Sequence, residues 1–192
     1  MTRTASLWIL TAIHVAATDP TQIVAFADPA GAPGRWFKNS LSVGDLAFME
    51  VNVIGVGYEG LDPDGLVSKL RLRGVTTVVD VRLNPISRKR GLSKSALRAR
   101  LADEKIAYEH LPSLGNPRDN REGFAELEGG AARAVREKFG EVLNTEPAQE
   151  ALIRVIELAA GGTVALLCFE KDETRCHREL VLTALRTQLL AA

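Results

Sequence analysis

Residues 75–81, VTTVVDV, form the most β-branched run of the chain. Their apolar side chains follow one another without alternation, which is typical of a parallel strand buried on both faces. The apolar runs MEVNVIGV (residues 49–56) and TVALLCF (residues 163–169) have the same character, and residues 106–110 predict a shorter strand. The sequence therefore predicts a sheet of buried, parallel strands.

Helix signals lie between these runs. Asp62 and Pro63 offer an N-cap and a first-turn proline for a helix that ends at Arg73, and Ser93 offers the cap of the next helix. Further helices are predicted over residues 135–143, 147–160 and about 175–190. This alternation predicts a single Rossmann-like α/β domain of three layers, with a mostly parallel sheet and helices on both faces.

Composition narrows the class of protein. The 192 residues are 46% hydrophobic and 25% charged, which excludes a disordered chain, a collagen-like chain and a disulfide-stapled miniprotein. Lys plus Arg and Asp plus Glu both number 24, so the net charge of zero gives no global attraction to nucleic acid or to anionic lipid. The two cysteines, Cys168 and Cys176, favour a reducing, cytoplasmic location.

The first quarter of the chain differs from the rest. Residues 28–40 hold two prolines and two glycines and read as a linker, and the regular alternation begins after them. We interpret residues 1–48 as an N-terminal extension, either an extra strand plus loop or a start-site artefact, and residues 49–192 as the α/β domain. The apolar run 6–17 leaves a signal peptide open as an alternative, and it is too short to span a membrane.

Unusual polar side chains gather where the predicted strands end. Ligands of open α/β sheets bind outside the carboxyl ends of the strands, so these side chains predict one site. We expect six of them to meet around a shared pocket: Asp80, Arg82, Tyr108, His110, Glu170 and His177. The oligomeric state is not predicted.

Asp80 lies within an apolar strand, where a bare carboxylate would cost several kcal/mol. Arg82 points to the same face two residues on. The pair is either a structural ion pair that fixes the following loop, or it contains an acid that orients a catalytic group or holds a ligand hydroxyl.

A local excess of positive charge follows. Residues 81–102 contain seven basic residues and no acidic one. Because Arg grips phosphate or carboxylate through two parallel hydrogen bonds, this segment predicts an anion site. Arg98 and Arg100 are interpreted as the solvated face of a helix. The expected ligand-binding side chains are Arg82, Ser87, Arg88, Tyr108, His110 and Arg178.

Cys176 and His177 open the last predicted helix. With Thr174 as the N-cap, Cys176 lies in the first turn, where the helix dipole favours a thiolate. The acidic residues 170, 172 and 173 oppose this. The pair is therefore a nucleophile with its partner, or a packed cysteine beside a hydrogen-bonded histidine.

No cofactor and no metal is predicted. A metal site would need three of Cys168, Cys176, His177 and His110 to converge without a diagnostic spacing. Gly55-x-Gly57-x-x-Gly60, with Asp80 further on, spells a dinucleotide fingerprint. Asp62 and Pro63, however, place the helix start after the glycines, so a pyrophosphate would lack its N–H cradle.

The motifs taken together resemble one family. They are Ile54-Gly55-x-Gly57, Val79-Asp80-Val81-Arg82, Asn84-Pro85-x-Ser87-Arg88, Ile106-x-Tyr108-x-His110-Leu111, Leu114-Gly115, Leu167-Cys168-x-Glu170 and Cys176-His177-Arg178. Over about residues 51–185 the chain resembles the domain of unknown function 488 family. The resemblance implies an α/β domain of bacteria and archaea and no established reaction. Tyr58 stands where family members usually have Ser or Thr, which is expected to change one wall of the site.

Three functions remain open, and whether the protein is an enzyme is left open with them. The first is a site for a small anionic, phosphorylated or nucleotide-like ligand. There Arg82, Arg88 and Arg178 bind the anion, Tyr108 and His110 orient the substrate, and Asp80 or Glu170 transfers the proton. The second is a rhodanese- or phosphatase-like enzyme using Cys176 or Cys168. The third, ranked last because the loop lacks aromatic side chains, is a nucleic-acid or protein interaction module using residues 88–90.

Overall fold

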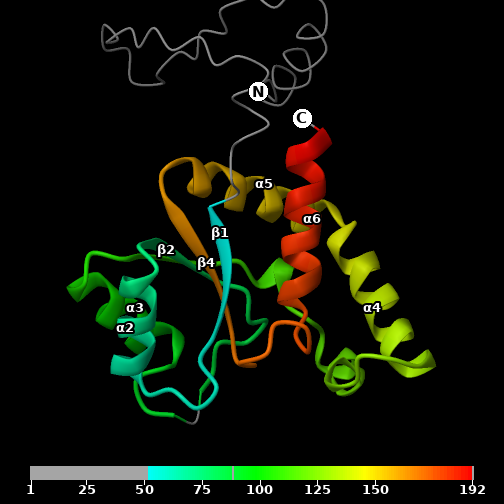
Figure 1. Ribbon diagram of the computed structural model, residues 1–192, viewed down its shortest axis with the longest axis horizontal. Coiled ribbons are helices and arrows are strands. Elements are labelled where there is room, and N and C mark those ends of the chain that lie inside the picture. The colour runs from blue at the N-terminus through cyan, green and yellow to red at the C-terminus, as the bar shows by residue number, and fades with distance from the viewer. Residues whose placement is uncertain (1–51, 88, 192) are drawn as a thin grey trace, which may run out of the picture. The chain divides into compact units, whose positions relative to one another are not determined.

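Four parallel strands form one sheet in the computed structural model, which describes residues 52–87 and 89–191 (Figure 1). They lie in the order β1-β4-β2-β3. Their bounds are β1 Val53–Gly57, β2 Val75–Asp80, β3 Ala107–His110 and β4 Thr163–Cys168. The predicted extension of residues 1–48, and the signal-peptide alternative within it, lie outside the described residues.

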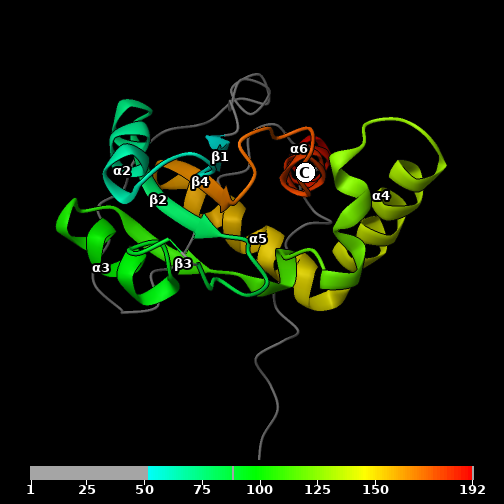
Figure 2. The same cartoon turned by 90° about the horizontal axis from the view of Figure 1, so that it is seen from below.

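Helices cover both faces of the sheet (Figure 2). On one face lie α2 (Pro63–Leu72) and α3 (Lys94–Asp103); on the other lie α5 (Glu146–Ala160) and α6 (Arg178–Ala191), with α4 (Gly130–Leu143) packed against them. Three 3-10 turns join β3 to α4: η1 (Pro112–Leu114), η2 (Arg118–Asn120) and η3 (Glu122–Ala125). The prediction of a three-layer α/β fold is confirmed. None of the described helices combines the length and the apolarity that crossing a membrane requires.

The unbroken apolar runs fill two cores at once. Val78 packs into the core beneath α2 and α3, whereas its neighbour Val79 packs into the core beneath α5 and α6. Likewise, Leu167 packs into the core beneath α2 and α3, and Leu166 packs into the core beneath α5 and α6. Because successive strand residues point to opposite faces, a strand covered on both sides needs apolar residues at every position. This explains why the sequence shows no alternation there.

Asp62 caps α2 as predicted, since its carboxylate accepts a hydrogen bond from the Gly65 N–H at 2.7 Å. The starts of two other helices, α4 and α6, differ from the predicted ones. α4 begins at Gly130, five residues before the predicted start at residue 135. Its first residues, Gly-Ala-Ala, carry no amphipathic signal, although Ala is a strong helix former. α6 begins at Arg178, later than predicted, with consequences for the site below.

The strand order creates a crevice above the carboxyl ends. β4 lies between β1 and β2, although it is the last of the four described strands along the chain. From β4 the chain turns to α6 on one face, and from β2 it turns to α3 on the opposite face (Figure 2). Loops that leave neighbouring strands in opposite directions leave a gap between them, which is where ligands of open α/β sheets bind.

Candidate functional site

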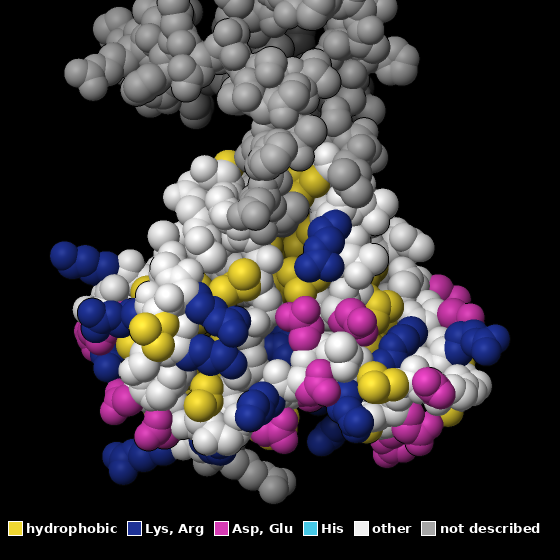
Figure 3. Space-filling view, viewed as in Figure 1, with side chains coloured by type: hydrophobic (Ala, Val, Ile, Leu, Met, Phe, Trp, Pro, Cys, Tyr) yellow, Lys and Arg dark blue, Asp and Glu magenta, His cyan; other side chains and the backbone are white. Residues whose placement is uncertain are grey.

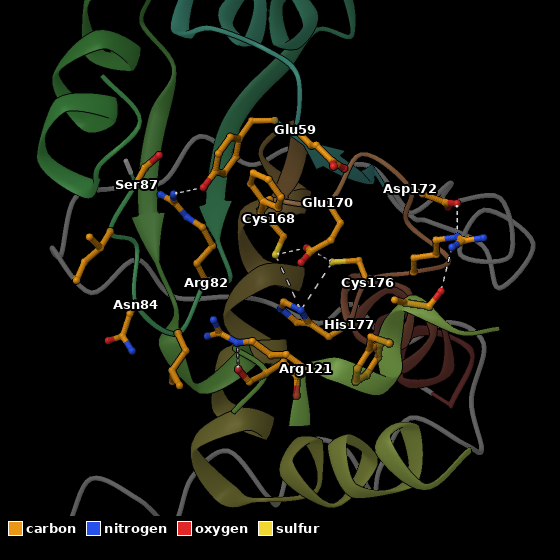
Figure 4. Close-up of a pocket in the computed structure, with 18 of the residues that line it drawn as sticks. Glu59, Arg82, Asn84, Ser87, Arg121, Cys168, Glu170, Asp172, Cys176 and His177 are labelled. Atoms are coloured by element: carbon orange, nitrogen blue, oxygen red, sulfur yellow. Dashed lines mark hydrogen bonds and ion pairs between the residues drawn. The ribbon is translucent and has the colours of Figure 1, made fainter. Parts of the chain in front are cut away.

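A cavity of about 700 Å³ opens at this crevice. Its walls come from the loops after β1, β2 and β4 and from the 3-10 segment before α4. Glu59 follows β1, Arg82, Asn84 and Ser87 follow β2, Asn116 and Arg121 belong to the 3-10 segment, and Glu170 follows β4. Figure 4 labels Glu59, Arg82, Asn84, Ser87, Arg121 and Glu170 around a common space.

Two thiols form the floor of the cavity. The thiols of Cys168 and Cys176 each donate a hydrogen bond to Oε2 of Glu170 at 3.1 Å. On their other side lies Nδ1 of His177, 4.0 Å from the Cys168 sulfur and 3.7 Å from the Cys176 sulfur. The two sulfurs therefore lie between a carboxylate and an imidazole (Figure 4). Both cysteines are free and buried, at 5% and 1% exposure.

The environment of His177 determines which ring nitrogen carries a proton. Nε2 lies 3.3 Å from the carbonyl oxygen of Val81, which can only accept, so Nε2 carries the N–H. In the neutral imidazole, Nδ1 then presents its lone pair toward the two sulfurs. Phe139 packs edge-on against the ring with centroids 5.2 Å apart, which restricts its rotation. The imidazole is thus held as an acceptor or a metal ligand facing the thiols.

The turn before α6 corrects the predicted position of Cys176. Asp172 accepts hydrogen bonds from the main-chain N–H and the hydroxyl of Thr174, and the Cys176 N–H donates to the Glu173 carbonyl. These bonds hold residues 172–177 as a turn, so Thr174 does not cap the helix and Cys176 precedes its first residue. The predicted placement of Cys176 in the first helical turn is wrong.

The two thiols differ in acidity. The neighbouring Cys168 thiol, His177 and the charge of Arg178 lower the pKa of the Cys176 thiol to about 6 against the effect of burial. The neighbouring Cys176 thiol, burial and the Glu170 carboxylate raise the pKa of Cys168. Burial would raise the pKa of Glu170, but hydrogen bonds from the thiols and from the main chain outweigh it, so that pKa is lowered. Cys176 is therefore the more acidic of the two thiols.

A second polar network lies beneath the wall formed by β2. Arg82 donates to both carboxylate oxygens of Asp80, from Nε at 2.8 Å and from Nη2 at 2.5 Å. Its Nη1 donates to the hydroxyl of Tyr58 and to the carbonyl of Leu92, both at 3.0 Å. The hydroxyl of Tyr108 donates to Asp80 at 2.6 Å. Of the five guanidinium N–H groups, these four bonds leave one for any ligand.

The structure divides the predicted site residues into three groups. Arg82, Ser87, Glu170, Cys176 and His177 line the cavity. Asp80, Tyr108, His110 and Arg178 do not line it. Arg88 lies outside the described residues, so the hypothesis of a basic 88–90 loop stays a prediction.

The residues outside the cavity are bonded to the main chain or to each other. Asp80 is fully buried behind Arg82, and Tyr108 approaches Asp80 from the side of α3. His110 bonds through Nε2 to the Arg82 carbonyl and through Nδ1 to the Lys94 ammonium, both at 2.9 Å. Arg178 is fully buried and donates to the Glu170 carbonyl at 2.5 Å. Their contacts are those of groups that hold the walls in place.

Gly55 and Gly57, which belong to the dinucleotide-like glycine pattern, allow the loop between β4 and α6 (residues 169–177) to approach β1. A Cβ on Gly57 would lie 1.8 Å from the Glu170 carbonyl oxygen, and one on Gly55 would lie 1.6 Å from the carboxylate of Glu173. The loop thus occupies the space that a pyrophosphate would need, and α2 begins only at Pro63. Both observations agree with the interpretation that these glycines do not form a dinucleotide site.

Several cavity residues escaped the sequence analysis. Arg121 and Phe124 come from the 3-10 segment between β3 and α4, which has no periodic pattern and no strand end to mark it. Tyr58, noted as a departure from the family pattern, does form one wall of the cavity. Cys168, which the sequence offers as a nucleophile or as a metal ligand, reaches the cavity floor at the end of β4.

Comparison with known proteins supports the family assignment. A family model described as "Domain of unknown function DUF488" matches residues 62–185, nearly two thirds of the chain. The match includes β2, β3, β4 and most of the cavity residues. No curated protein and no solved structure matches the chain.

Proposed function

The chain belongs to the family of the domain of unknown function DUF488, and we propose that its cavity binds a small molecule with a phosphate or carboxylate group and an apolar body. A volume of about 700 Å³ is within the range of small-molecule sites. Phe124, Phe169 and Ile86 supply apolar wall, while Asn84, Ser87 and Asn116 supply neutral hydrogen-bonding groups.

The observation that carries this proposal is how the charges around the cavity are used. The two cations Lys89 and Arg121 contact main-chain carbonyls, those of Leu61 at 3.1 Å and Asn116 at 3.3 Å, and no described carboxylate forms an ion pair with either. Their positive charge is therefore available to a ligand.

The acids that line the cavity already have partners. Glu170 accepts from both thiols, and Asp172 accepts from Thr174 and lies 3.5 Å from Arg175. Glu59 accepts from the main-chain N–H of Lys171 at 3.0 Å. On the face shown in Figure 3, basic and acidic side chains are interspersed. With a net charge of zero, attraction of an anion has to come from local groups such as Lys89 and Arg121.

Ligand-dependent thermal unfolding of the full chain tests this proposal. Phenyl phosphate, inorganic phosphate and pyrophosphate are compared with chloride at equal ionic strength. A ligand at 100 times its Kd stabilises by about 2.7 kcal/mol, which raises the Tm by roughly 5–10 °C for a domain of this size. Phenyl phosphate is expected to bind better than inorganic phosphate because of the apolar wall.

Two variants and a matched control locate the site. Lys89→Ala and Arg121→Ala should each weaken binding about tenfold, since each removes a charged hydrogen bond. Arg133→Ala, an exposed arginine of α4 outside the cavity, should bind as the wild type does. Equal Tm shifts in all four proteins, or no shift with any of the three phosphates, would overturn the proposal.

A further inference from the structure

We propose that Cys168, Cys176 and His177 bind a zinc ion, with Glu170 in the fourth position, at the floor of the cavity. This inference does not rest on the anion site, because three of its four donors are already together without a ligand. Two of them, Cys168 and Glu170, come from the end of β4 and the loop after it, and the other two precede α6. Among the described residues, the ligand atoms of the two cysteines and the histidine all lie within 4.8 Å of one another.

Four of the distances between donor atoms are close to the edges of a tetrahedron. Bonds of about 2.3 Å from zinc to sulfur and about 2.0–2.1 Å to nitrogen or oxygen, at a tetrahedral angle, place neighbouring ligand atoms roughly 3.5 Å apart. The sulfur-to-nitrogen distances here are 4.0 and 3.7 Å, and both sulfur-to-oxygen distances are 3.1 Å. The two cysteines and His177 thus lie close to a coordination geometry, and the Glu170 carboxylate has to turn toward the ion to take the fourth position.

The histidine is prepared for such a role. A metal-bound histidine usually donates its second ring N–H to a carbonyl or a carboxylate, which fixes the tautomer and the ring orientation. His177 does so through Nε2 to the Val81 carbonyl, and Phe139 packs against its ring. The nitrogen that faces the sulfurs is therefore the one with the free lone pair.

Zinc would neutralise most of the negative charge of its ligands. It would bind the two sulfurs as thiolates, forming two Zn–S bonds, and each thiol that is protonated before binding would release its H⁺ to solvent. With the Glu170 carboxylate, the loaded site would carry a total charge of −1. Arg178, fully buried and bonded to the Glu170 carbonyl, supplies a compensating positive charge.

The donor set selects the type of metal. Two thiolates, one imidazole and one carboxylate suit zinc, whereas magnesium and calcium prefer shells made of oxygen alone. The carboxylate is the weakest of the four ligands toward a soft ion. All four residues line the cavity, so a ligand there can displace the weakest of them, Glu170, from the fourth position.

Metal titration of the full, chelator-treated chain under reducing conditions tests the inference. We expect one equivalent of Zn²⁺ to bind with a nanomolar or lower Kd in competition with a chromophoric chelator. Co²⁺ in the same site should give the visible bands of a tetrahedral complex and a thiolate-to-cobalt charge-transfer band in the near ultraviolet. Mg²⁺ should not compete.

Variants assign the ligands. Cys168→Ser, Cys176→Ser and His177→Gln should each weaken Zn²⁺ binding by at least about 100-fold. His110→Gln is the matched control, because His110 also has both ring nitrogens bonded but lies outside the cluster. Circular dichroism establishes that each variant is folded.

A measurement on the wild-type protein makes the test independent of how the variants fold. Bound Zn²⁺ should protect both thiols from iodoacetamide. A cobalt complex without the charge-transfer band, or alkylation of either thiol at the same rate with and without Zn²⁺, would overturn the inference and leave the anion site unaffected. Absence of phosphate binding with zinc binding intact would overturn the anion site and leave the zinc inference standing.

Discussion

Asp80 and Arg82 form a buried, two-pronged ion pair although a single residue separates them in the chain. The strand ends at Asp80, and the Arg82 main-chain N–H turns back to donate to the same carboxylate at 3.1 Å. Burial alone would lower the pKa of Arg82, but the Asp80 carboxylate reverses the effect and raises it. The pair closes the end of β2 and sets the direction of the loop that forms one wall of the cavity.

Arg82→Met should lower the free energy of unfolding by about 3–5 kcal/mol, because it leaves a fully buried carboxylate without its partner. Urea unfolding measures this change. Arg100→Met, which breaks partly exposed ion pairs with Asp64 and Glu104, should have no comparable effect.

The double variant Asp80→Leu, Arg82→Met should be more stable than Arg82→Met alone, since no charge then remains buried. If the losses of stability measured for Asp80→Leu and Arg82→Met simply add in the double variant, the coupling between the two side chains is contradicted.

Tyr108 should make stability depend on alkaline pH. Burial, and the charge of Asp80 that its hydroxyl contacts, raise its pKa above the ordinary value of about 10. Its stabilising contribution is therefore complete below about pH 10. It is lost as the pH rises above that value, because the unfolded chain ionises first.

The variant Tyr108→Phe separates this effect from general alkaline unfolding. Tyr108→Phe should be less stable than the wild type at pH 8, yet lose less stability between pH 8 and 11, as measured by urea unfolding. Identical slopes in the two proteins would contradict the effect.

Gly57→Ala should displace the loop that carries Glu170, because the added Cβ would lie 1.8 Å from a main-chain oxygen. We expect a large loss of stability and, under the zinc proposal, loss of zinc binding. Gly140→Ala is the matched control: nothing lies within 4 Å of its Cβ, and alanine in a helix should stabilise by up to about 1 kcal/mol. A Gly57→Ala protein as stable as Gly140→Ala would show that the close approach is unimportant.

The fold could be predicted because its strands are covered on both faces. Val78 and Val79 are both fully buried, in different cores, and such a position leaves a continuous apolar signal in the sequence. The strand order was not predicted. That β4 enters between β1 and β2 depends on how the described helices pack on the sheet, which no local pattern records.

The site was predicted where strand ends mark it and missed elsewhere. Arg82 and Glu170 follow strands, so their convergence follows from the parallel sheet. Arg121 reaches the cavity from a 3-10 segment without periodicity. The meeting of Cys168 with Cys176 and His177 depends on the turn that Asp172 holds before α6. The spacing of the two cysteines in the sequence does not reveal it.

Glu170→Gln should change the affinities for anion and zinc in opposite directions. Removing the negative charge from the cavity floor should strengthen phenyl phosphate binding severalfold. The same change replaces a carboxylate that contacts both thiols and should weaken Zn²⁺ binding about tenfold or more.

Glu59→Gln is the matched control. Glu59 lines the same cavity and contacts the Lys171 N–H rather than a thiol, so its substitution should strengthen anion binding and leave zinc binding unchanged. Calorimetric titration of each variant with each ligand separates the two effects. Weakened anion binding in both variants would show that the carboxylates organise the cavity instead of repelling its ligand, and equal zinc affinities for Glu170→Gln and wild type would remove Glu170 from the coordination shell.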